Sequence, residues 1–235
     1  MAYLYFDNVT VDYPIYNGSS KSFKNNIINI STGGFLSKNS DNIVTVTALK
    51  NVNFKLSDGD SVGLVGHNGA GKTTLLRTMA GIYSPTSGIV RKSGNISTII
   101  ELGAGLDSEL TGYENIYRLG FLLNLSKNEI DKIIPSIETF TELGNFLYAP
   151  VRTYSSGMLM RLMFAVNTAS KPEILIVDEM FGTGDKDFQK KAEDRMNNVI
   201  SASKIFIFAS HSDHLLNKFC NRIFELNHGM VIEVS

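Results

Sequence analysis

Apolar and polar residues alternate along this chain in two different periods, one typical of strands and one typical of helices. Residues 51–56 alternate strictly between polar and apolar side chains, which predicts a strand with one buried face. Three short runs that are almost wholly apolar, at 61–65, 174–177 and 204–209, predict strands that are buried on both faces. An aromatic and β-branched segment at 3–13 predicts a further strand near the start of the chain.

Helical signals lie between these strands. The first predicted helix ends at Gly81, a residue that favours the helix C-terminus. Two capping boxes, in which Glu follows a Ser or Thr by three positions, predict helices that begin after Thr111 and Ser126. Pro135 is expected to bend or break the second of these. Another helix is predicted over 155–169.

The closing residues predict a β-hairpin, because Asn227-His228-Gly229 separates two apolar runs. Strands that alternate with helices predict an α/β fold with a mainly parallel core sheet and additional antiparallel β elements.

The segment from about 17 to 42 is rich in Asn, Ser, Lys and Gly and is predicted to be a polar insertion between two strands. Within it, apolar residues at 23, 27 and 30 predict one short amphipathic helix.

Composition narrows the possible functions. The 22 basic and 23 acidic residues give a net charge of −1, which argues against a protein that coats nucleic acid. A single cysteine, Cys220, excludes an intramolecular disulfide and a multi-cysteine metal cluster. No apolar run reaches the about 20 residues needed to cross a bilayer. A role at a membrane would therefore need a partner that provides the span.

The strongest chemical signal is a glycine-rich loop that matches G-x-x-x-x-G-K-[ST], placed after a buried strand and before a helix. Its backbone N–H groups and the following helix N-terminus are expected to bind phosphates. Lys72 is expected to pair with the β- and γ-phosphates, and the Thr73 hydroxyl to bind Mg²⁺. The residues predicted to bind ATP here are Gly66, His67, Asn68, Gly69, Ala70, Gly71, Lys72, Thr73 and Thr74.

Two further motifs fit the same chemistry. Asp178 ends a buried strand, where its carboxylate can hold Mg²⁺, and the adjacent Glu179 can polarise an attacking water. Ser155 and Gly157 belong to a serine-rich turn that opens a helix. Ser155 fits a simple N-cap there. The same hydroxyl and the exposed N–H groups can also bind a γ-phosphate.

These motifs, in this order and with Ala209-Ser210-His211, resemble the ATPase of ABC transporters over nearly the whole chain. Segments 101–106, 109–115, 154–158 and 184–185 resemble more narrowly the ATPases of bacterial exporters of O antigen, group 2 capsule or teichoic acid. The resemblance implies one P-loop nucleotide-binding domain over 1–235, with a helical subdomain at about 101–170. It leaves no room for an extra C-terminal carbohydrate-binding domain.

The resemblance also implies roles for single residues. Tyr13, or alternatively Tyr16, corresponds to the aromatic residue that stacks on adenine, and Glu101 falls near the Q-loop glutamine as a possible Mg²⁺ contact. Met158 stands where the family has glutamine. Catalysis is assigned to Lys72, Glu179 and His211, the switch histidine. The remaining contacts to ATP are assigned to Ser155, Gly157 and the D-loop residue Asp185.

The implied assembly is a head-to-tail homodimer, with each ATP held between the phosphate loop of one copy and Ser155–Gly157 of the other. Two copies of an integral membrane permease would complete it, at the cytoplasmic face of the bacterial inner membrane. The cargo would be a lipid-linked polysaccharide, with O antigen favoured and capsular polysaccharide or teichoic acid as the alternative. Nucleic acid is not expected as a partner. A P-loop kinase and a non-transport ABC ATPase are more distant alternatives.

Overall fold

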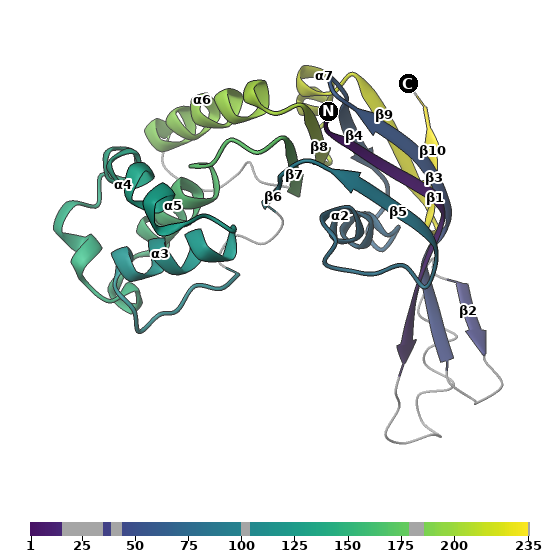
Figure 1. The fold of residues 1–235 in the computed structure, drawn as a ribbon, viewed down its shortest axis with the longest axis horizontal. Helices are drawn as coiled ribbons and strands as arrows, with labels where there is room; N and C mark the ends of the chain where they lie inside the picture. Colours follow the sequence, from purple (N-terminus) through teal and green to yellow (C-terminus); the bar gives the residue numbers. More distant parts are fainter. Residues whose placement is uncertain (16–34, 39–43, 100–103, 179–185, 235) are drawn as a thin grey trace. The chain divides into compact units, whose positions relative to one another are not determined.

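The computed structural model describes residues 1–15, 35–38, 44–99, 104–178 and 186–234. The chain forms two compact units, which are described separately below and drawn in Figure 1. Unit 1 comprises Met1–Gly94 and Ile205–Ser235, and unit 2 comprises Asn95–Lys204.

Unit 1 contains an antiparallel sheet whose strand order is β2-β3-β1-β5. Leu4 and Phe6 of one central strand and Val52 and Leu56 of the other are fully buried, as the alternating pattern predicts for strands with one buried face. The ring of Phe6 stacks on Phe54 at 4.4 Å between centroids. The strands are β1 (Tyr3–Ile15), β2 (Phe35–Lys38), β3 (Val44–Ser57) and β5 (Ser87–Ser93).

The second sheet of unit 1 has a parallel centre. Strand β4 (Ser61–Val65) lies between β8 (Ile205–Ala209) and β9 (Arg222–Asn227) and runs parallel to both. The final strand β10 (Met230–Glu233) pairs antiparallel with β9. Because parallel strands point the same way, the loops after β4 and β8 leave the sheet at one edge.

The turn between β9 and β10 is the predicted hairpin turn. His228 and Gly229 have φ angles of 48° and 76°. Positive φ at both central residues is the requirement of a type I′ turn, which matches the twist of paired strands. The helices described in unit 1 are α2 (Lys72–Ala80) and α7 (Asp213–Phe219), and α2 ends at the predicted Gly81 with a φ of 84°.

Unit 2 joins a parallel strand pair to a group of helices. The pair is formed by β6 (Ile96–Ile99) and β7 (Ile174–Asp178). A separate apolar core lies between helices and includes Ile116, Ile130 and Leu162, each completely buried. The helices are α3 (Gly112–Leu122), α4 (Lys127–Thr141), α5 (Ser156–Asn167) and α6 (Lys186–Ala202), with 3₁₀ turns at Gly144–Tyr148 and Val151–Thr153.

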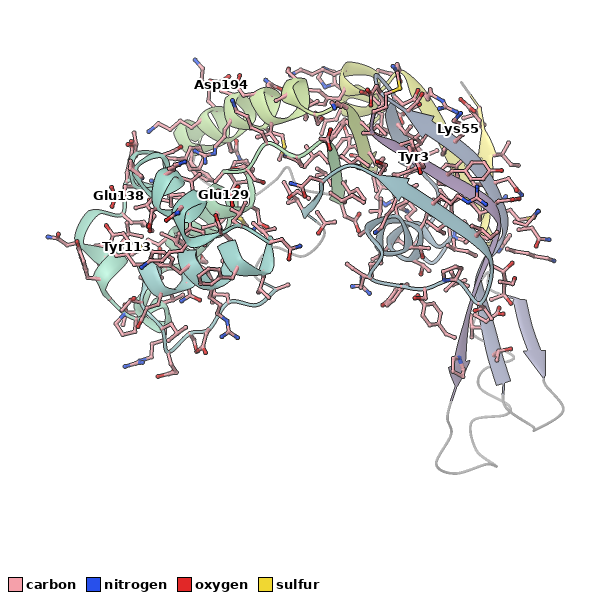
Figure 2. All side chains as sticks on the ribbon, in the orientation of Figure 1. Tyr3, Lys55, Tyr113, Glu129, Glu138 and Asp194 are labelled. Carbon is pink, nitrogen blue, oxygen red and sulfur yellow. The ribbon has the colours of Figure 1, made fainter. Side chains whose placement is uncertain are left out.

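Both predicted capping boxes are confirmed at the starts of α3 and α4. The Glu114 carboxylate accepts a hydrogen bond of 2.8 Å from the N–H of Thr111. Tyr113 then links the two helices by donating to Glu138 at 2.5 Å; both residues are labelled in Figure 2. Pro135 does not break α4, which continues to Thr141.

Several elements were not predicted from the sequence, among them β5, β6 and α7. Residues 35–38, inside the segment expected to be a polar insertion, form β2, and the helix expected near 23–30 lies outside the described residues. Helix α6 was also missed, although its buried residues follow a helical spacing. These are Phe188, Ala192, Met196 and Val199. In the part of the chain that is described, no helix is long and apolar enough to cross a bilayer.

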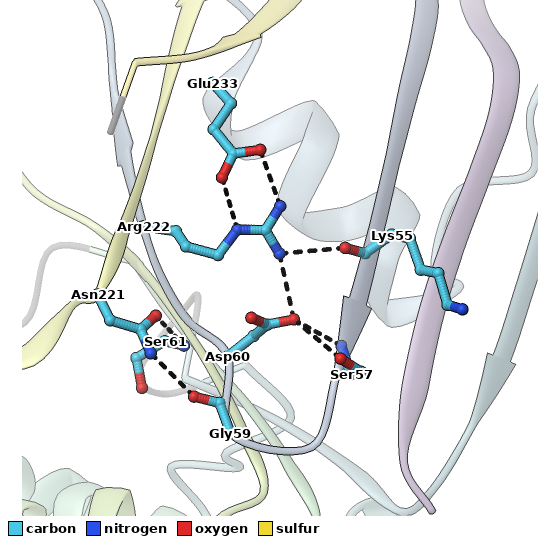
Figure 3. A network of polar contacts seen from close by, with 8 residues as sticks. All are labelled: Lys55, Ser57, Gly59, Asp60, Ser61, Asn221, Arg222 and Glu233. Carbon is cyan, nitrogen blue, oxygen red and sulfur yellow. Dashed lines mark hydrogen bonds and ion pairs between the residues drawn. The ribbon is translucent and has the colours of Figure 1, made fainter.

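Arg222 ties the closing hairpin to the rest of unit 1 (Figure 3). Its guanidinium donates to both carboxylate oxygens of Glu233, at 2.7 and 2.9 Å. It also donates to the Lys55 carbonyl at 3.1 Å and lies 3.1 Å from a carboxylate oxygen of Asp60. The hydrogen bonds from Arg222 lower the pKa of Glu233. One planar side chain therefore connects β9 to β10, to β3 and to the turn before β4.

We expect Arg222→Gln to lower the stability of the protein by about 1–2 kcal/mol, because bidentate charge-assisted hydrogen bonds are lost at a partly buried site. The melting temperature should fall by about 3–6 °C. Arg91→Gln, on the exposed face of β5, is the matched control and should change little.

The acid side of the stability curve should change too. Since the folded pKa of Glu233 is lowered from its ordinary value of 4.5, its contribution is present above pH 4.5 and is lost as the pH falls through the lowered pKa. Arg222→Gln should remove this part of the pH dependence. If the melting temperature of Arg222→Gln falls at low pH just as that of the wild type does, the assignment is contradicted.

Candidate nucleotide-binding site

The glycine-rich loop after β4 has a backbone that side chains other than glycine would strain. Gly66, Gly69 and Gly71 have φ angles of 152°, 84° and 109°, in the region that favours glycine. A Cβ on Gly66 would lie 2.5 Å from the Leu226 carbonyl oxygen, and one on Gly71 would lie 2.7 Å from that of Ala48. A Cβ on Gly69 would meet no atom of the described residues within 4 Å. The loop is therefore packed closely on the side of the sheets and open at Gly69.

The helix that follows the loop presents an uncapped N-terminus. Gly71 is its N-cap residue and has no side chain to accept from the first N–H groups, and the first turn holds no acidic residue. Such an end attracts anions through its N–H groups and the helix dipole. Lys72 donates to the Gly66 carbonyl at 2.5 Å and to the His67 carbonyl at 3.4 Å. An ammonium group over a loop of backbone donors fits the phosphates of a nucleotide.

The turn between β9 and β10 supports this loop from the far end of the sequence. Gly229 donates to the Ala70 carbonyl at 3.0 Å and accepts from the Lys50 N–H at 2.8 Å. The rings of His67 and His228, both exposed, lie 5.3 Å apart between centroids. No pattern in the sequence indicates that His228 lies near the loop. A distant turn thus fixes the backbone at the centre of the phosphate-binding segment.

Tyr13 also belongs to unit 1 and lies beside the start of α2. Its hydroxyl is 3.4 Å from the Thr74 hydroxyl, and its ring meets the ring of Tyr83 edge-on at 5.6 Å. Arg77 donates to the Tyr83 hydroxyl at 2.8 Å. Burial raises the pKa of Tyr13, so the phenol stays neutral at physiological pH. Tyr83 and Arg77 were not foreseen, and Tyr16 lies outside the described residues.

His211 follows β8, the strand beside β4 in the parallel sheet. Leu64 pairs with Ala209 in the register of these two strands. Ser210 and His211 consequently leave the sheet at the edge where Gly66 leaves it. The buried Ser210 accepts from the Ser212 N–H at 3.1 Å, while His211 is exposed.

Asp178 ends β7 in unit 2. It is partly exposed, whereas residues 174–177 before it are buried. Its carboxylate and the Thr73 hydroxyl are hard oxygen donors of the kind that Mg²⁺ prefers. Glu101, Glu179 and Asp185 lie outside the described residues. Within the described ranges, no group of three or more His, Cys, Asp or Glu side chains forms a metal cluster.

Ser155 is the N-cap of α5, as the sequence predicts, and its hydroxyl accepts from the Met158 N–H at 3.2 Å. Gly157 lies in the first turn of the helix, and among the described residues the only atom within 4 Å of a Cβ built there is the Ser155 hydroxyl oxygen at 3.9 Å. At Gly120, by contrast, a Cβ would clash with Ile130 at 2.7 Å. The packing of unit 2 does not require glycine at 157, so the exposed face of this turn has room for a ligand.

A pocket of about 550 Å³ opens beside this turn. Ser155 and Gly157 form part of its wall together with the apolar side chains of Phe146 and Met158. Arg161 adds a positive charge and lies 3.6 Å from the Glu142 carboxylate. The start of α5 therefore combines backbone donors with a partly apolar surface.

Comparison with known proteins identifies the family. The ABC transporter family model matches residues 49–182, more than half of the chain. The chain belongs to the ABC transporter family. The glycine-rich loop and Asp178 lie within this matched range, and His211 follows it.

Three curated relatives of this ABC protein carry names of export systems. It is 58% identical to the O-antigen export system ATP-binding protein RfbE of Yersinia enterocolitica, over 100% of this chain and 98% of that protein. It is 40% identical to RfbB of Myxococcus xanthus, another O-antigen export ATP-binding protein, over 81% of this chain and 44% of that one. It is 37% identical to the teichoic acids export protein TagH of Listeria monocytogenes, spanning 98% of this chain but 66% of that protein.

Solved structures agree on the fold. The ATP-binding subunit of an ABC transporter superposes with a TM-score of 0.71 at 21% identity, over 99% of this chain and 89% of that one. The cassette MJ0796, solved as a dimer bound to ADP and phosphate, gives a TM-score of 0.69 at 22% identity, over 99% and 98%. The expected P-loop ABC ATPase fold is therefore confirmed.

We expect Gly229→Ala to weaken ATP binding by this ABC protein, although the residue lies outside the loop. A Cβ there would lie 2.7 Å from the Ala48 carbonyl oxygen, at a φ of 76°, so the turn must move and release Ala70. The conformation alone costs about 1 kcal/mol. Binding of a fluorescent ATP analogue should fall about tenfold.

Gly59→Ala is the control for Gly229→Ala. Gly59 has a φ of 97° but nothing within 4 Å of a Cβ, so it carries the conformational cost without the collision. Equal affinity losses in the two variants would show that the turn has no special relation to the loop.

We expect Tyr13→Ala to weaken ATP binding about tenfold, since stacking on a base contributes about 1–3 kcal/mol. Tyr13→Phe keeps the ring and should stay within about twofold of the wild type. Tyr16→Ala tests the other tyrosine in the same titration. A loss confined to Tyr16→Ala would transfer the adenine contact to that residue.

Proposed function

We propose that this chain is the ATP-hydrolysing subunit of an exporter that moves a lipid-linked polysaccharide, O antigen in the first place, across the bacterial inner membrane. The observation that carries the nucleotide role is the glycine loop that leads into an uncapped helix N-terminus beneath Lys72. Support for the cargo comes from the relative named for O-antigen export, which is similar to this chain over 98% of its own length.

In this proposal the phosphates lie along the loop, where backbone N–H groups and Lys72 hold them. Thr73 and Asp178 would hold Mg²⁺, which neutralises charge on the β- and γ-phosphates. Glu179 orients the attacking water and His211 contacts the γ-phosphate. Most of the rate enhancement then comes from positioning and charge neutralisation.

A second copy of the chain completes each site by bringing its Ser155 and Gly157 to the γ-phosphate. Two observations support this role for α5. In the described part of the chain, only the Ser155 hydroxyl lies within 4 Å of a Cβ built on Gly157, and the first turn of α5, which Ser155 caps, carries no acidic residue. Both favour an anion approaching from outside the unit. Asp185 of the second copy would add a further contact.

Coupling to transport requires a membrane subunit, and we propose two permease copies with the ATPase dimer on their cytoplasmic side. The chain would then be a peripheral protein of the inner membrane. Capsular polysaccharide or teichoic acid is the alternative cargo, and the similarity to TagH from Listeria supports the latter.

We expect Glu179→Gln to lower phosphate release by about a hundredfold or more, because a positioned general base commonly contributes 10²–10⁴-fold. ATP binding should persist. Lys72→Ala should instead remove binding. Asp194→Asn, an exposed carboxylate on α6 labelled in Figure 2, is the control and should keep full turnover. Normal turnover by Glu179→Gln would refute the assignment of the base.

The cargo is tested in cells. Deletion of the gene should leave lipopolysaccharide without long O antigen and accumulate the lipid-linked polymer inside the membrane. The wild-type gene should restore export, and the gene carrying Glu179→Gln should not. Loss of capsule or teichoic acid with normal O antigen would select the alternative cargo.

A purified chain that transfers phosphate to small acceptors, rather than releasing it, would support the P-loop kinase. Salt-sensitive binding of nucleic acid would support a non-transport ABC ATPase. Either result would replace the exporter proposal.

A further inference from the structure

The C-terminal end of α5, opposite Ser155, is bound by one arginine from α6. Arg195 donates from Nε to the Thr168 hydroxyl at 2.8 Å and from Nη2 to the Ala165 carbonyl at 3.1 Å. Its third nitrogen donates to the Ser136 hydroxyl of α4 at 3.3 Å. The Thr168 hydroxyl in turn donates to the Phe164 carbonyl at 2.6 Å. One side chain thus satisfies the last turn of α5 and links it to two other helices.

Arginine is well suited to this position. Its planar guanidinium presents several donors in fixed directions, and a cation at a helix C-terminus interacts favourably with the helix dipole. The guanidinium also lies over the Phe140 ring, 4.5 Å from its centroid. Burial lowers the pKa of Arg195. Within the described residues no ion pair of Arg195 is found, so carbonyls, hydroxyls and a ring compensate its charge.

Aromatic contacts fix the other end of α6 against α5. Phe188 in the first turns of α6 packs edge-on against Phe164 at 6.1 Å and against Phe140 at 5.5 Å. Arg161 of α5 lies over the Phe188 ring at 5.1 Å. Phe188 also lines the pocket beside Ser155. The second half of α5 is therefore held against α6, by the Phe188 ring at Arg161 and Phe164 and by Arg195 at Ala165 and Thr168.

We propose that Arg195 is a positioning residue for ATP hydrolysis: it fixes the axis of α5 and so the direction in which Ser155 and Gly157 face a nucleotide held by a second copy. The proposal rests on the role of α5 given above. Helix α5 is about 18 Å long and behaves as a rigid rod. If its C-terminal end is displaced and the helix pivots about its middle, its N-terminal end moves by a comparable distance. Displacements of about 1 Å at a reacting centre can reduce rates about a hundredfold.

The test compares Arg195→Gln, Arg195→Lys and Thr168→Val, with Lys190→Gln on the exposed face of the same helix as control. Three quantities are measured: the affinity of single chains for a fluorescent ATP analogue, ATP-driven dimerisation in a Glu179→Gln background, and kcat against KM. Circular dichroism and melting curves report folding. Measurements are made well below the melting temperature of every variant.

We expect ATP affinity of single chains within about twofold of the wild type in all variants, because the phosphate loop belongs to unit 1. Arg195→Gln should weaken ATP-driven dimerisation and lower kcat by about tenfold or more. Thr168→Val should do the same to a smaller degree, and the double variant should lose no more than Arg195→Gln alone. Arg195→Lys keeps the positive charge but lacks the planar set of donors, so its dimerisation and kcat should lie between those of Arg195→Gln and the wild type.

Wild-type dimerisation and kcat in folded Arg195→Gln would overturn the inference and leave only a structural role. If Arg195→Gln does not fold, Thr168→Val and Arg195→Lys decide in the same way. A failure of the proposed function would give a different result. In that case the protein with the wild-type Arg195 does not dimerise with ATP, or Ser155→Ala changes neither dimerisation nor kcat.

Discussion

A single glycine in the turn between β9 and β10 bonds in two directions. The N–H of Gly229 reaches Ala70 in the phosphate loop, and its carbonyl receives the N–H of Lys50 in β3. These two hydrogen bonds therefore join three segments that are far apart in the sequence: the β9–β10 turn, the phosphate loop and β3. The left-handed conformation of Gly229 and the approach of Ala48 leave no room for a side chain. The geometry of the phosphate loop depends on this contact.

The hairpin that carries Gly229 is held in place at its other end as well. Arg222, at the start of β9, binds Glu233 at the end of β10 and reaches the Lys55 carbonyl in β3 (Figure 3). The hairpin is thus fixed to β3 near both ends, by Lys50 at the turn and by Lys55 at the open end. Rigid attachment of this kind is what preorganises backbone donors for an anion, since little reorganisation remains when phosphate binds.

Local sequence patterns predicted much of this architecture, because they depend on residues close together in the chain. The capping boxes at Thr111 and Ser126, the helix end at Gly81 and the Asn-His-Gly hairpin turn are all confirmed. The glycine loop was recognised for the same reason. Helix α6 was missed although four buried residues follow its period, since charged and polar residues dominate the segment between them.

Contacts between distant segments could not be predicted from one sequence. Nothing near His228 indicates His67, and nothing near Tyr83 indicates Tyr13. Such pairs follow from strand register and from the order of strands in a sheet. A single chain carries no direct signal for either quantity. The support of the phosphate loop and the surroundings of the adenine-stacking candidate are consequently findings of the structure.

The glycines of this protein include some that close packing requires and one that packing does not explain. Gly63, Gly112 and Gly120 have ordinary backbone conformations, but a Cβ on any of them would come within 2.7 Å of a neighbouring side chain. Gly157 also has an ordinary conformation, yet a Cβ there would come within 4 Å of no described atom except the Ser155 hydroxyl oxygen. Alanine would be the better helix former at this position by about 1 kcal/mol. A residue that the fold does not need, and that costs stability, is best explained by something that must come close from outside. In the proposed dimer, that is the γ-phosphate bound by the other copy.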